Sequence, residues 1–121
     1  GVTIDGFTVS PRFFPGGDIG KLAICGSTND LAVRGVKPLY LAMGILIEEG
    51  LLKEELLKVI DSAYRVSRDL DVKLIAGDTK VLPRGQADGM YITCCALGEV
   101  LSRYWSYRTT RCFNIGPSLR P

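Results

Sequence analysis

The chain has 121 residues, of which 46% are hydrophobic and 23% are charged, as expected for one globular domain. Residues 1–100 contain 11 Lys and Arg against 13 Asp and Glu, whereas residues 101–121 contain four Arg and no acid, so the net charge of +2 comes from the C-terminal end. The body of the chain therefore lacks the basic face of a nucleic-acid-binding protein, and its longest apolar run, residues 39–46, is too short to span a bilayer. We expect neither a nucleic acid nor a membrane as a partner.

The cysteines restrict the chemistry further. Cys25, Cys94, Cys95 and Cys112 form no C-x-x-C pair, and the chain has no histidine. A zinc site of the Cys/His type and a histidine-based catalytic triad are thus excluded. Residues 1–5 resemble the start of a strand rather than a secretory leader, so we expect a cytoplasmic protein whose cysteines are reduced and act as small hydrophobic residues.

The pattern of apolar and turn residues predicts an alternation of strands and helices. In chain order, the predicted elements are a strand over residues 3–10, a loop over 12–17, a helix over 18–34, a strand over 39–49, a helix over 53–70, a strand over 72–76, a loop over 81–88 and a strand over 90–100. Asp18 is the expected N-cap of the first helix and Gly35 its stop. Lys37-Pro38 is expected to interrupt the chain before the next strand.

This order predicts an α/β domain with helices on one side of a mixed sheet. We place the domain at residues 1–100; residues 101–121 form either the start of a further element or a segment outside the fold. The helix over residues 53–70 has the clearest helical spacing of apolar residues. Asp61 and Arg65 are expected to form a stabilising (i, i+4) ion pair on its solvent-exposed side. Its expected buried face consists of Leu56, Ile60, Ala63, Ser67 and Leu70, with Leu57 and Tyr64 beside it.

Asp30 is an unexpected carboxylate in the first helix. At 100° per residue it shares a face with Ile19, Ala23 and Val33. A carboxylate on an apolar face loses several kcal/mol of hydration and needs a cation, a lysine or backbone donors to offset that loss. The alternative is that Asp30 lies at the helix edge and is solvated. The sequence leaves both interpretations open.

Two glycine-containing stretches could contact phosphate. "GGDIGKL" at residues 16–22 is not a P-loop, because Pro15 and Leu22 break the pattern G-x-x-x-x-G-K-[ST], but a glycine-rich helix start can still offer N–H groups to an anion. "GDTK" at residues 77–80 is expected to be a turn just after a strand, where α/β proteins often bind ligands. A polar turn without function fits "GDTK" about as well.

Residues 3–100 resemble the HypE family of hydrogenase maturation factors, which is related to aminoimidazole ribonucleotide synthetase, selenophosphate synthetase and thiamine monophosphate kinase. The resemblance depends on "FFPGGDIGKLA", "NDLA", "KPLYL" and "GDTKV" together. It implies an ATP- and Mg²⁺-dependent enzyme that converts a thiocarboxamide on a C-terminal cysteine into a thiocyanate, the source of the cyanide ligand in [NiFe]-hydrogenase. It also implies a homodimer whose sheets form a barrel, and as partners the carbamoyltransferase HypF and the HypC–HypD scaffold complex.

The resemblance also implies roles for ten residues. It implies metal ligation by Asp5 and Asp30, a catalytic role for Asp78 and Lys80, and nucleotide binding by Asp18, Gly20, Lys21, Asn29, Gly77 and Thr79. The family's upstream glycine-rich segment, its C-terminal domain and its terminal cysteine have no counterpart in this sequence, which therefore resembles a part of such a protein. Two alternatives remain: another ATP-dependent branch, similar to selenophosphate synthetase or thiamine monophosphate kinase, or a non-catalytic dimerisation module.

Overall fold

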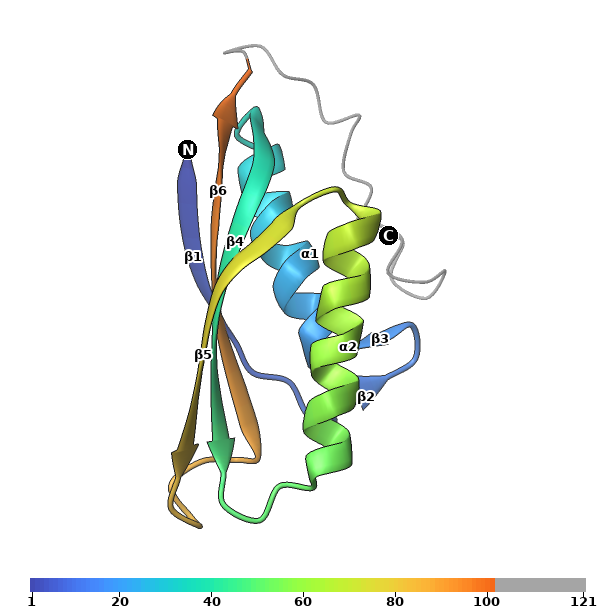
Figure 1. The fold of residues 1–121 in the computed structure, drawn as a ribbon, viewed down its shortest axis with the longest axis vertical. Coiled ribbons are helices and arrows are strands. Elements are labelled where there is room, and N and C mark those ends of the chain that lie inside the picture. Colours follow the sequence, from blue (N-terminus) through green and yellow to red (C-terminus); the bar gives the residue numbers. More distant parts are fainter. Residues whose placement is uncertain (102–121) are drawn as a thin grey trace.

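The computed structural model describes residues 1–101 and shows one sheet covered on one face by two helices (Figure 1). Its elements are β1 (Val2–Phe7), β2 (Phe13–Phe14), β3 (Gly17–Asp18), α1 (Ile19–Ala32), β4 (Val36–Glu48), α2 (Lys53–Asp69), β5 (Lys73–Leu82) and β6 (Met90–Val100). Nearly all of the predicted C-terminal tail, residues 102–121, lies outside the described residues. No helix within residues 1–101 is long and apolar enough to cross a membrane.

The main sheet is mixed, with the strand order β1-β6-β4-β5. β4 pairs with β5 in parallel, and β6 pairs antiparallel with both β1 and β4. The parallel step requires a crossover, and α2 provides it on the same side of the sheet as α1 (Figure 1). The predicted fold class, an α/β domain with a mixed sheet and helices on one face, is confirmed.

The core lies between the sheet and the helices. Side chains alternate between the two faces of a strand, so Leu41, Met43 and Ile45 of β4 are buried under the helices. Their neighbours Tyr40 and Leu46 project from the opposite face, where they are 42% and 37% exposed. No element within residues 1–101 covers this second face, which we call the open face.

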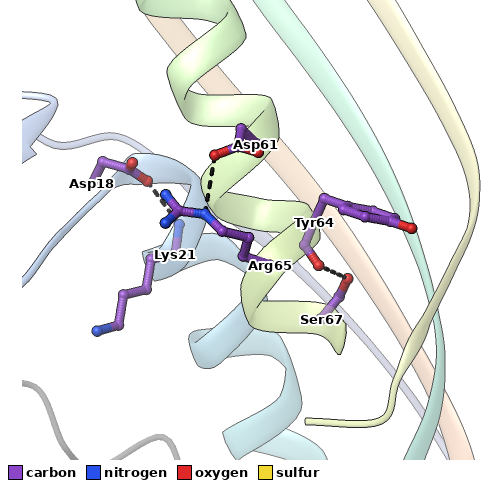
Figure 2. Close-up of polar contacts among 6 residues, drawn as sticks. All are labelled: Asp18, Lys21, Asp61, Tyr64, Arg65 and Ser67. Atoms are coloured by element: carbon purple, nitrogen blue, oxygen red, sulfur yellow. Dashed lines mark hydrogen bonds and ion pairs between the residues drawn. The ribbon is translucent and has the colours of Figure 1, made fainter. Parts of the chain in front are cut away.

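α1 begins as predicted. Asp18 is buried in the N-cap position, and its Oδ1 accepts a hydrogen bond of 2.9 Å from the backbone N–H of Lys21 (Figure 2). The preceding segment is not only a loop, because Phe13–Phe14 pairs with Gly17–Asp18 in a short hairpin. Gly16, at the tip of this hairpin, has a φ of 92°, a value that favours glycine.

The predicted buried face of α2 was partly wrong. Ala63 and Ser67 are buried, but Leu57, Ile60 and Tyr64 are exposed, and the face is centred on Val59. The reason is a close helix–helix contact, since a Cβ on Gly20 of α1 would collide with the carbonyl oxygen of Val59. The face that meets α1 is therefore the one with short side chains. The Asp61–Arg65 pair is confirmed, with Arg65 Nε 3.0 Å from Asp61 Oδ2 (Figure 2).

Two predicted breaks do not occur. Lys37-Pro38 lies within β4, because the register shifts beside Pro38 and its partner across the ladder is Gly98, where a Cβ would collide with the Lys37 carbonyl. Such a bulge accommodates a proline in a paired strand. "GDTK" is likewise not a turn after a strand: residues 77–80 lie inside β5, which pairs on one side only and so can carry exposed polar residues.

Candidate functional site

The structure brings the two predicted metal ligands, Asp5 and Asp30, together. Asp5 lies on β1 with its side chain on the helix-covered face, since its register partner Cys94 is fully buried there. Asp30 lies on α1, and its carboxyl group is close enough to that of Asp5 for the two to interact. One turn earlier, Gly26 packs against the Phe7 ring, which brings α1 close to β1. Two carboxylates therefore face each other between the helix and the edge strand.

Asp30 is exposed, so the prediction that it lies on an apolar helix face was wrong, and the alternative of a solvated edge position holds. The reason is that this side of α1 points at β1, the edge of the sheet, where little covers it. Partial loss of hydration, followed by the negative charge and hydrogen bond of Asp5, raises the pKa of Asp30, and Arg34 offsets part of the rise. A cation between the two acids would relieve this repulsion.

A second group of predicted residues lies at the start of α1. Asp18 caps the helix, and the Nζ of Lys21 donates a hydrogen bond of 2.8 Å to the carbonyl of Gly16 in the hairpin. Gly20 is buried against Val59, so helix packing alone requires a glycine there. Asn29 is half-buried near the other end of α1, next to Asp30. Asn29 is thus beside the carboxylate pair, whereas Asp18, Gly20 and Lys21 lie about two turns or more away along the helix.

The third group lies on β5, at the opposite edge of the sheet. Gly77, Asp78, Thr79 and Lys80 are all exposed. Across the sheet Asp5 pairs with Cys94, Cys94 with Met43, and Met43 with Gly77. Asp5 and Gly77 are therefore at the same level and three strand spacings, about 14 Å, apart.

Asp78 and Lys80 lie on the open face, as their register partners Gly44 and Leu46 do. A shallow hollow of about 330 Å³ is centred there, and its lining residues include Ala42, Gly44, Asp78, Thr93 and Cys95. One copy of the domain thus carries the carboxylate pair on the covered face and Asp78 and Lys80 on the open face. The structure does not bring these two groups together.

Sequence reasoning missed two polar contacts near these groups. Thr3 Oγ1 donates a hydrogen bond of 3.3 Å to Asp5 Oδ2, and Arg12 Nη2 lies 2.7 Å from Glu55 Oε2. The first had a usable signal, because residues two apart on a strand share a face. The second joins residues 43 positions apart and depends on the tertiary packing of the hairpin segment against α2.

Comparison with known proteins defines the class. The family model described as "AIR synthase related protein, N-terminal domain" matches residues 1–100, and the chain belongs to this family. The chain is 48% identical over 99 residues to "Carbamoyl dehydratase HypE" of Bradyrhizobium diazoefficiens, a match that covers 82% of this chain and 29% of the relative. The chain therefore spans about a third or less of the length of the curated relatives that it matches.

Comparison with solved structures also shows similarity to HypE proteins. The domain is similar to a hydrogenase maturation protein HypE in complex with ATP, with a TM-score of 0.82 and 44% identity over 84% of this chain and 30% of the other. It is similar to a chain of a HypE–HypF complex, with a TM-score of 0.81 and 46% identity over 84% of this chain and 33% of the other. A thiamine monophosphate kinase from Aquifex aeolicus, at 14% identity and a TM-score of 0.62 over 81% of this chain and 33% of the other, shares the fold alone. The resemblance to HypE predicted from the motifs is confirmed.

Proposed function

We propose that this chain is the nucleotide-binding and dimer-forming part of a HypE-type carbamoyl dehydratase that acts in the cytoplasm. The observation that carries the proposal is the Asp5–Asp30 carboxylate pair, found in a domain with 44% identity to a HypE that binds ATP. Among the described residues, Cys94 and Cys95 are unpaired cysteines, as expected in a reducing compartment. Residues 1–100 form the functional domain in this proposal.

The donor set of the carboxylate pair fits magnesium. Among residues 1–101 no group of three or more His, Cys, Asp or Glu could hold a metal by itself. Mg²⁺ in nucleotide enzymes is commonly held by one or two protein carboxylates, with water and the substrate phosphates as the remaining ligands. Asp5 and Asp30 would hold the ion, which would neutralise phosphate charge during phosphoryl transfer.

The remaining predicted residues have roles in binding and transfer. Asn29, Gly77 and Thr79 contact the nucleotide, with Asp18, Gly20 and Lys21 at the start of α1 as the more distant candidates. Lys80 supplies positive charge to the transferring phosphoryl group, and Asp78 orients the reacting groups. In the whole protein, ATP would phosphorylate the oxygen of a cysteine-linked thiocarboxamide, and loss of phosphate would leave the thiocyanate, with ADP and phosphate as the other products.

A second copy completes the site in this proposal. Asp5 and Asp78 lie on opposite faces and edges of one sheet, too far apart for one nucleotide phosphate group to contact both. The open face also carries exposed apolar residues that favour a partner, namely Val2, Ile4, Tyr40, Leu46 and Leu97. A homodimer that pairs two open faces as a barrel would bury this surface. HypF and the HypC–HypD complex are the proposed partners of the complete protein.

One alternative function has an observation in its favour. The separation of the carboxylate pair from Lys80 within one copy is also what a non-catalytic dimerisation module would show. The kinase-like alternative has only a shared fold to support it. The two remaining functions differ in metal-dependent nucleotide binding, which a dimerisation module would lack.

Calorimetry on the full-length protein tests the proposal. The wild type should bind ATP in a magnesium-dependent manner, and Asp30→Asn should abolish this binding because one of two metal carboxylates is lost. Asp69→Asn, an exposed acid at the end of α2, is the matched control and should bind as the wild type does. Normal Mg–ATP binding by Asp30→Asn would exclude the metal site, and absence of binding by the wild type would favour the dimerisation module.

A further inference from the structure

Thr3 touches the carboxylate pair without belonging to it. It lies two residues before Asp5 on β1, so both side chains project toward the helix-covered face. Their register partners, Ala96 and Cys94, are both fully buried on that face. Thr3 Oγ1 donates to Asp5 Oδ2 over 3.3 Å. One oxygen of Asp5 thus accepts a hydrogen bond from a residue of the same strand.

We infer that Thr3 is a positioning residue that orients the Asp5 carboxylate for a divalent cation, an inference that rests on the proposed function. A carboxylate on a strand can rotate about its terminal bond, and that torsion is broad. The Thr3 hydroxyl holds one oxygen of Asp5 and so limits this rotation. The other oxygen, Oδ1, would keep its lone pairs available to the cation.

The length of the contact separates orientation from stability. An O–H···O hydrogen bond is usually 2.5–3.0 Å long, so a bond of 3.3 Å contributes little to folding. Partners that orient metal-binding carboxylates nevertheless change metal affinity by about 10- to 100-fold. Loss of the hydroxyl should therefore weaken cation binding while the melting temperature stays almost unchanged.

The experiment uses the full-length protein and Mn²⁺ alone as the probe, with the free ion measured by electron paramagnetic resonance. Thr3→Val keeps the branched shape and strand preference of threonine but removes the hydroxyl. Thr3→Ser keeps the hydroxyl. Thr8→Val makes the same chemical change at an exposed threonine beyond the end of β1 and is the matched control. Thermal melting of each variant reports folding, and Thr3→Ala repeats the deletion if Thr3→Val has no melting transition.

We expect Thr3→Val to bind Mn²⁺ about 10- to 100-fold more weakly than the wild type, with Thr3→Ser and Thr8→Val close to wild type. Wild-type affinity in the hydroxyl-free variant would overturn the inference. So would equal losses in Thr3→Ser and Thr3→Val, because side-chain shape would then be responsible. Absence of Mn²⁺ binding by the wild type itself would instead overturn the proposed metal site, so the two failures are distinguishable.

Discussion

The two edges of the sheet differ in how they carry polar residues. At β1 the carboxylate of Asp5 faces the helical layer and meets Asp30 from α1. At β5 the residues of "GDTK" stand exposed, and Asp78 and Lys80 point to the open face. Lysines on an edge strand discourage unwanted strand pairing, so Lys80 has a structural as well as a proposed catalytic reason to be there. In the proposed function each edge supplies one half-site, and the two half-sites lie apart within one copy.

The largest expected effect is the loss of activity when the 121-residue chain is separated from the rest of the protein. We predict that the 121-residue chain alone has no ATP-dependent dehydration activity, because the acceptor must be held in line with the γ-phosphate and this positioning supplies much of the rate. In the full-length protein, Lys80→Ala should lower turnover by roughly 100-fold through loss of positive charge near the transferring group. ATP-dependent phosphate release, with the carbamoylated protein as substrate, measures both the activity of the 121-residue chain and the turnover of Lys80→Ala.

The control for this prediction is on the same strand. Lys73→Ala removes an exposed lysine from the other end of β5 and should leave turnover within about twofold of wild type, as expected for a surface change away from the site. Substrate-dependent phosphate release by the 121-residue chain would contradict the first half of the prediction. Wild-type turnover by Lys80→Ala would contradict the second.

The open face provides the next test. Gly44 lies at its centre, and a Cβ there would have no heavy atom within 4 Å, so the fold of one copy does not require a glycine. We predict that Gly44→Arg leaves the domain folded but prevents self-association, since it places an unpaired charge at the middle of an apolar interface. Light scattering should give the mass of a dimer for the wild type and of a monomer for the variant.

Leu57→Arg is the matched control for this test, because Leu57 is 53% exposed on α2, on the opposite side of the molecule. It should remain dimeric. A wild type that is monomeric at micromolar concentration would count against the pairing of open faces. A dimer that persists in Gly44→Arg would move the interface elsewhere.

The difference between the edges also explains what the sequence could and could not predict. Short-range patterns were reliable: the bounds of β6 and the Asp18 cap agree with prediction, since strand periodicity and capping depend on neighbouring residues. Long-range contacts were not. Pro38 lies within a strand because Gly98 of β6 accommodates the bulge, and "GDTK" continues a strand because β5 is at an edge. No local pattern reveals either partner.

The candidate site follows the same rule. The resemblance selected Asp5 and Asp30, and the structure places them together. The helical wheel alone put Asp30 on a buried face, because it has no information on where the sheet ends. The Gly20 position likewise looked like a phosphate-binding turn but has a packing partner in Val59, 39 residues later. The distance between Asp5 and "GDTK" could be obtained only from the register of the four paired strands.

Two ion pairs sharpen the comparison of buried and exposed charges. The Arg12–Glu55 pair ties the hairpin segment to α2, with side chains 26% and 31% exposed, whereas those of Arg65 and Asp61 are 69% and 64% exposed. Glu55→Gln should lower the free energy of unfolding by about 1–2 kcal/mol, and Asp61→Asn by at most about 0.5 kcal/mol. Urea denaturation measures both, and equal effects would mean that Arg12 gains nothing from its partial burial.

The smallest expected effect is a change in stability caused by Asp30→Asn, whose direction depends on whether the metal is bound. In the metal-free protein Asp30 faces the like charge of Asp5, and its raised pKa means that the folded state disfavours its ionised form. Asp30→Asn removes that charge and keeps an oxygen that can accept a hydrogen bond. It should raise the stability of the metal-free protein by a few tenths of a kcal/mol, the scale of exposed like-charge pairs. High salt should shrink this gain in stability by screening the two charges.

Addition of Mg²⁺ and ATP should make the wild type the more stable of the two proteins, since only the wild type gains binding energy. Thermal melting with a chelator and then with Mg–ATP gives both comparisons. A variant less stable than wild type under chelation would show that the two carboxyl groups share a proton and stabilise the fold, so that the site is not poised for a cation.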